Sequence, residues 1–97
     1  MTTDPDLAEL QTCIASQGAR LHSVELKHVE HKGTTHTTLR AFQINGRRIA
    51  AITSAAFTTN AVIALLREHF AEIRWVDHGR MCTIHVKGFH SAPLRAE

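Results

Sequence analysis

The chain has 97 residues, of which 43% are hydrophobic and 21% are charged, with only five glycines and two prolines. This composition is too apolar for a disordered chain and too poor in glycine and proline for a low-complexity segment. The formal net charge is +2 with histidine neutral, and protonation of the eight histidines would raise it steeply. We therefore expect one domain over residues 1–97 with a pH-dependent charge and with flexible ends at 1–4 and 88–97.

The first residues and the hydropathy of the chain predict its cellular compartment. Residues 1–6 hold two aspartates and no basic residue, whereas a secretory signal opens with basic residues and an apolar stretch. The longest uninterrupted apolar run, residues 61–66, is far shorter than the roughly 20 residues of a membrane span. We expect a cytoplasmic protein with no membrane partner, in which Cys13 and Cys82 are reduced, buried thiols. A disulfide or redox pair is the alternative for these cysteines.

The first element is a predicted helix that begins at Pro5 and ends at Gly18. Thr3 or Asp4 can cap it, and Pro5 suits the first turn because that position needs no backbone N–H. Gly18 is a natural residue for the position after a helix. The apolar stripe of this helix consists of Leu7, Leu10, Cys13 and Ile14.

Three strands follow, because the hydrophobic period changes to two from Leu21 onward. Lys32-Gly33 is predicted to turn the chain into a threonine-rich strand over residues 34–44. Asn45-Gly46 is the strongest hairpin signal in the chain, since both central positions of a type I′ turn need a positive φ. The third strand is predicted over residues 47–53.

A second helix is predicted from Thr58 or Thr59 to about Ala71, and its inward stripe consists of Val62, Leu65, Leu66, His69 and Phe70. A last hairpin is predicted over 73–77 and 81–86, with His78-Gly79 as its turn. The fold class is therefore α+β in the order α-β-β-β-α-β-β. We expect an antiparallel meander plus a C-terminal hairpin, as a strongly bent or two-part sheet with two helices packed on one face.

The turns fix the strand registers, and the registers fix the faces. The predicted pairing gives one continuous apolar face, which we expect to be the core: Val24, Leu26, Leu39, Ala41, Ala50 and Ile52. In the last hairpin the same reasoning places Trp75 opposite Cys82 and His85 opposite Glu72. His69 is expected to be a hydrogen-bonded residue in the core or at its boundary.

The opposite face of the meander is predicted to carry the functional surface. The register places Glu25 beside Arg40 and Phe42 beside Ile49, so a small apolar island that also includes Ile44 lies among basic residues. Exposed apolar patches of this kind mark contact sites. The predicted binding residues are Glu25, Lys27, His36, Arg40, Phe42, Arg47 and Ile49. The alternative is that another element covers the island.

Metal, cofactor and catalytic sites are not predicted. His28 and His31 are three residues apart on a strand and therefore point to opposite faces, whereas His31 and His36 share a face but are too few for zinc. The cysteines lie on expected inner faces with no activating base, and no glycine-rich phosphate loop is present. We expect a protein that is not an enzyme.

The sequence therefore predicts a small binding protein, an inhibitor or adaptor, that docks its sheet surface onto another protein, with a homodimer through that surface as an option. Nucleic-acid binding by the arginine-rich face is an alternative, because double-stranded-RNA-binding domains share the order helix–three strands–helix. The chain departs from them at Thr59-Asn60-Ala61, where they have a lysine-rich helix start. The full element order is also similar to that of chaperones that bind type III secretion effectors, although those are typically acidic and end in a third helix.

Overall fold

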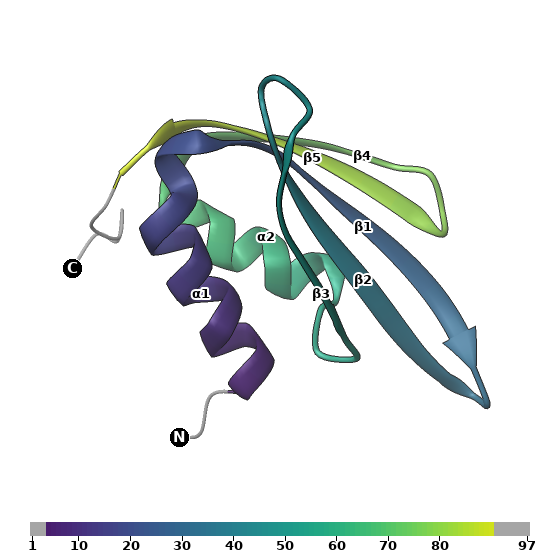
Figure 1. Ribbon diagram of the computed structural model, residues 1–97. Coiled ribbons are helices and arrows are strands. Elements are labelled where there is room, and N and C mark those ends of the chain that lie inside the picture. Colours follow the sequence, from purple (N-terminus) through teal and green to yellow (C-terminus); the bar gives the residue numbers. More distant parts are fainter. Residues whose placement is uncertain (1–3, 91–97) are drawn as a thin grey trace.

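The computed structural model describes residues 4–90 and contains two α-helices and five strands in the predicted order α-β-β-β-α-β-β (Figure 1). The elements are α1 (Pro5–Gln17), the 3-10 turn η1 (Gly18–Arg20), β1 (Leu21–His31), β2 (Thr34–Gln43), β3 (Arg48–Ser54), α2 (Thr59–Arg67), β4 (Phe70–Asp77) and β5 (Met81–Phe89). The predicted flexible ends at 1–3 and 91–97 lie outside the described residues. Asp4, one of the two expected caps, caps α1, and β5 continues through Phe89.

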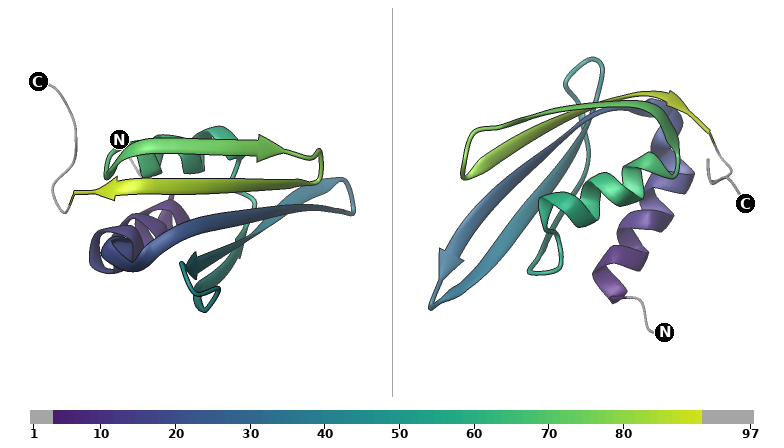
Figure 2. Two further views of the ribbon diagram at one scale, coloured as in Figure 1. Left: turned by 90° about the horizontal axis from the view of Figure 1, so that it is seen from above. Right: turned by 180° about the vertical axis from the view of Figure 1, so that it is seen from behind.

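The strands form one antiparallel sheet in the order β3-β2-β1-β5-β4, and both helices lie on the same face of it (Figures 1 and 2). The expected alternative of a two-part sheet is wrong because β5 pairs with β1, which joins the C-terminal hairpin to the meander. Val24 and Leu26 of β1 face the helices and are 2% and 0% exposed. Burial of each such side chain stabilises the fold by about 1.5–3 kcal/mol.

The register of the meander is confirmed where it forms the core. Leu26 lies opposite Leu39, and Leu39 lies opposite Ile52. Lys32-Gly33 is the predicted two-residue turn, with φ values of 51° and 79° that suit a type I′ turn. The core is completed by the helices, chiefly through Leu10, Ile14, Val62, Ile63 and Leu66.

Two of the three predicted turns differ from expectation. At Asn45-Gly46 only the glycine has a positive φ, and its N–H donates to the Gln43 carbonyl at 2.9 Å, so a type I turn followed by a left-handed glycine replaces the type I′ turn. In the last hairpin the His78 N–H donates to the Met81 carbonyl at 2.7 Å, so the loop residues are Gly79-Arg80.

The new loop shifts the register of the last hairpin by two residues. Trp75 lies opposite Ile84 instead of Cys82, and His85 lies opposite Arg74 instead of Glu72. The faces are unaffected, because a shift of two residues preserves the alternation of side chains. The predicted His85–Glu72 contact is therefore wrong, and Ile84, opposite Trp75, is fully buried in the core.

The second helix ends at Arg67, four residues before the predicted boundary, and β4 begins at Phe70. The Phe70 ring packs against the Phe89 ring with centroids 5.5 Å apart, which places Phe70 in the sheet. His69 is 3% exposed and its Nδ1 lies 2.9 Å from the His90 carbonyl, which confirms the expectation of a hydrogen-bonded buried residue.

Each helix is tied to the sheet near its N-terminus. The Ser54 hydroxyl at the end of β3 donates to Asp6 of α1 at 2.6 Å. In α2, the Thr59 hydroxyl lies 3.3 Å from Nε2 of His28, whose Nδ1 lies 2.6 Å from the Thr37 hydroxyl. His28 therefore links β1, β2 and the start of α2 through one imidazole ring.

Gly18 is required because a larger side chain would not fit at this position. Its backbone angles do not require glycine, since its φ of −60° is helical. A Cβ atom there would lie 2.1 Å from Cε1 of Phe89. We predict that Gly18→Ala lowers the free energy of unfolding by about 1–3 kcal/mol, measured by urea denaturation.

The double variant Gly18→Ala/Phe89→Leu, compared with Phe89→Leu alone, is the control, since the smaller side chain should remove most of the cost. A Gly18→Ala protein more stable than the parent, as the lower chain entropy of alanine alone would give, would contradict the close approach.

Candidate functional site

The face of the sheet that points away from both helices is not covered by any described element (Figure 2). We call it the outer face. It is formed by the residues that alternate with the core residues, centred on Glu25 and Lys27 of β1, Arg40 and Phe42 of β2, and their neighbours on β3, β4 and β5. Antiparallel sheets commonly leave one face to solvent in this way.

Five of the predicted binding residues lie on the β1–β2 part of the outer face: Glu25, Lys27, His36, Arg40 and Phe42. The Arg40 guanidinium lies 3.3 Å from Oε1 of Glu25, the residue directly opposite it. Lys27 lies opposite Thr38, and His36 lies opposite Val29, as predicted. Because Arg40 retains 37% side-chain exposure, this ion pair remains available to a partner.

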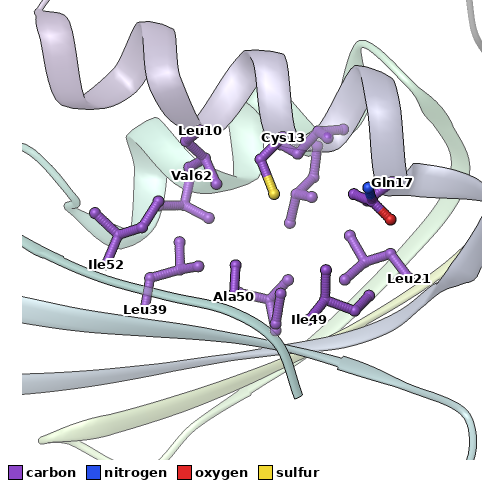
Figure 3. A pocket seen from close by; sticks show the side chains of 13 residues that line it. Leu10, Cys13, Gln17, Leu21, Leu39, Ile49, Ala50, Ile52 and Val62 are labelled. Carbon is purple, nitrogen blue, oxygen red and sulfur yellow. The ribbon is translucent and has the colours of Figure 1, made fainter. Parts of the chain in front are cut away.

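Ile49 does not belong to this surface, and the prediction that paired it with Phe42 was wrong. A bulge in β3 places both Ile49 and Ala50 opposite Ala41, so that Phe42 lies opposite Arg48. Ile49 and Ala50 both line the space beneath α1, as Figure 3 shows. The bulge therefore turns Ile49 toward the helices, and Arg48 takes its place beside Phe42.

A second bulge, in β1, adds a residue to the outer face that sequence reasoning missed. Leu21 pairs with Gln43 and Ser23 pairs with Phe42, so His22 is the extra residue between them. The His22 ring makes an edge-on contact with the His85 ring, with centroids 5.6 Å apart. The alternating pattern gives no signal for this bulge, because it depends on pairing with β2 and β5.

Arg47 and Ile44 lie in the turn between β2 and β3 and not within the sheet. Ile44 is 82% exposed, and the Arg47 N–H donates to Oδ1 of Asn45 at 2.9 Å. Arg47 lines a groove on the α1 side of the sheet together with Cys13 and Gln17. The predicted island of Phe42, Ile44 and Ile49 is thus divided between the outer face, the turn and the helix side.

The outer face is basic. Among the residues that the structure describes, it carries five cationic side chains and two carboxylates: Lys27, Arg40, Arg48, Arg74, Lys87, Glu25 and Glu72. One carboxylate is paired with Arg40, and the other lies opposite Lys87. Four other carboxylates, Asp4, Asp6, Glu9 and Glu68, lie in the helices or at their ends.

The space between α1 and the sheet does not form a ligand site. Its volume is about 10 Å³, close to the minimum for one water molecule, and its lining is apolar (Figure 3). The Cys13 sulfur points into this space. Burial, with a smaller effect of the Glu9 carboxylate, raises the pKa of the Cys13 thiol above its ordinary value.

Cys82 is fully buried, and its pKa is raised in the same way by burial and by the Asp77 carboxylate. Both thiols are free. A raised pKa keeps them protonated at neutral pH, and a protonated thiol is a poor nucleophile. Within residues 4–90, no group of three or more His, Cys, Asp or Glu side chains is arranged to hold a metal ion.

Comparison with known proteins does not assign the chain: no family model, curated protein or solved structure matches it. In the part of the chain that the structure describes, neither helix has the length and apolar character needed to cross a membrane. The outer face is therefore the feature of this protein from which a function can be inferred.

We predict that iodoacetamide alkylates both thiols of the folded protein slowly at neutral pH, and Cys82 more slowly than the half-buried Cys13. The rates should rise only above the ordinary thiol pKa of about 8.5, because the thiolate is the reactive species. Mass spectrometry of timed samples measures the rates, with urea-unfolded protein as the control in which both thiols react alike. Rapid alkylation of folded Cys82 at neutral pH would contradict the assignment.

Proposed function

We propose that this protein is a non-catalytic binding protein, an inhibitor or adaptor, that docks its outer face onto an acidic surface of another protein. The observation that carries the proposal is the combination of basic and apolar side chains on a face that neither helix covers. We place the interaction in the cytoplasm, where the free thiols Cys13 and Cys82 stay reduced.

The apolar part of the outer face favours a protein as the partner. Val29 on β1 and Val76 on β4 are 47% and 55% exposed, and Phe42 on β2 is half-buried. Phe42 is the one aromatic Phe or Trp side chain on the described outer face, whereas single-stranded nucleic acids are bound on several stacked aromatic side chains. A surface with scattered aliphatic groups and few aromatic rings suits a protein interface better.

The Glu25–Arg40 ion pair holds the Arg40 guanidinium in a defined position on the outer face, where a partner can bind it. Glu25 holds the Arg40 guanidinium by one contact at 3.3 Å, which leaves other N–H groups of the fork free. Arginine binds carboxylates through two parallel hydrogen bonds, and this geometry favours an Asp or Glu of the partner at this point. Phe42, on the same face of β2, supplies apolar area beside it.

The test uses the full chain as bait in its native host, with captured proteins identified by mass spectrometry. For the captured partner we expect Phe42→Ala and Arg40→Glu each to weaken binding at least about tenfold, as removal of interface anchors does. Arg67→Glu, the same charge change on α2 at the helix side, is the matched control and should bind as the parent does. Circular dichroism verifies that each variant is folded.

The double variant Glu25→Arg/Arg40→Glu distinguishes a loss of folding from a loss of partner binding. It keeps an ion pair across β1 and β2 but exchanges the positions of the two charges. We expect it to be folded and to lose the partner. If it and the single variants bind normally, the outer face is not the docking surface.

Nucleic-acid binding is the second candidate, and the basic excess of the outer face is the observation that favours it. Binding to nucleic acid must weaken steeply as salt rises, because counterions are released from the phosphates. Fluorescence anisotropy with duplex and single-stranded oligonucleotides measures this slope. If the affinity for an oligonucleotide falls steeply with salt and is lost in Arg40→Glu, nucleic acid and not protein is the partner of the outer face. If no oligonucleotide binds, this candidate function is excluded.

A further inference from the structure

A different part of the molecule, the free edge of β4, carries a second interaction surface. We propose that β4 pairs antiparallel with β4 of a second copy of this chain, which joins the two five-stranded sheets into one. This inference does not rest on the proposed function, because it uses the backbone groups of the β4 edge, with Glu72 and Arg74 at the border of the outer face.

The β4 edge has unpaired backbone groups. β4 is the last strand of the sheet, and no described strand pairs with its far side. The hydrogen bond from His78 N–H to the Met81 carbonyl fixes which residues direct their backbone groups toward β5. Since these residues alternate, Ala71, Ile73 and Trp75 direct their N–H and C=O groups outward, away from β5.

The β4 edge carries charged side chains, Glu72, Arg74 and Asp77, but it lacks the other usual protections. Phe70–Asp77 contains no proline, no glycine and no break in its register apart from its first residues. Trp75 and Val76 are 42% and 55% exposed, one on each side of the sheet. The other edge strand, β3, has the bulge at Ile49 and is tied to α1 through Ser54. Bulges and covering elements are the means by which proteins block edge pairing, so β4 is the open edge.

Charge selects the register of self-pairing. If Ile73 lies opposite Ile73 of the second copy, Glu72 lies opposite Arg74, and the two-fold symmetry gives this pair twice. A slip of two residues in one direction places Arg74 opposite Arg74, and in the other direction it places Glu72 opposite Glu72. A slip of one residue pairs outward-directed backbone groups with groups already bonded to β5. Of these registers, the one centred on Ile73 is the one that satisfies both the backbone and the charges.

The same register suits the side chains. Trp75, over which the Arg67 guanidinium lies at 5.6 Å, falls opposite the small Ala71 of the second copy. The small side chain leaves room for the indole on the helix side of the joined sheet. A two-fold axis perpendicular to the sheet places the helices of both copies on one face and both outer faces on the other.

The test is a charge exchange at the centre of the edge, with sedimentation velocity over a range of concentrations. We expect the parent chain to dimerise, and Arg74→Glu and Glu72→Arg each to raise the dimer Kd about tenfold, because each creates two like-charge contacts. The double variant Glu72→Arg/Arg74→Glu restores opposite charges and should regain most of the affinity. Arg47→Glu, the same charge change in the β2–β3 turn at the other edge of the sheet, is the control, and circular dichroism verifies folding.

Amide hydrogen exchange distinguishes pairing at the β4 edge from a general change in the stability of the fold. The amides of Ile73 and Trp75 should become protected as the concentration rises, while the exchange of β3 amides stays unchanged. A parent chain that is monomeric up to about 1 mM would overturn the proposal. So would single variants that dimerise normally, or a double variant that fails to recover. These results do not depend on the Phe42 and Arg40 variants, so the two proposals fail separately.

Discussion

The central strand β1 is the constraint on which the rest of the structure depends. It is hydrogen-bonded on both sides, to β2 and β5, so its alternation sets the faces of the whole sheet. Val24 and Leu26 point to the helices, and Glu25 and Lys27 point away. A shift of one residue would bury two charges and expose the core, which costs far more than the net stability of a small domain. The helices therefore pack on one face only.

Two bulges adjust this regular pattern around Phe42. One turns Ile49 from the outer face to the apolar space beneath α1, where its burial stabilises the fold. The other brings His22 onto the outer face beside His85. Their combined effect is that Phe42 is flanked by basic or titratable side chains in place of a second isoleucine. The outer face is consequently more basic and less apolar than the alternation alone indicates.

The two proposed surfaces are geometrically compatible. Strand pairing at β4 uses backbone groups in the plane of the sheet, whereas docking uses side chains that project from the outer face. Self-pairing would set two outer faces side by side, so a partner with two acidic sites could bind both copies with increased avidity. Arg74 and Glu72 lie at the border between the surfaces, and their substitution is therefore informative mainly for the edge.

The sequence by itself determined the element order, the core face and the Glu25–Arg40 pair, because alternation and the Lys32-Gly33 turn are local signals that fix a register. It also identified both helix starts, whose caps are encoded within a few residues. Only the tertiary structure decided the β1–β5 pairing, the early end of α2 at Arg67 and the side to which Ile49 points. Each of these depends on contacts between distant segments: Phe70 packs against Phe89 in the sheet, and the bulge at Ile49 is defined by the pairing of β3 with β2.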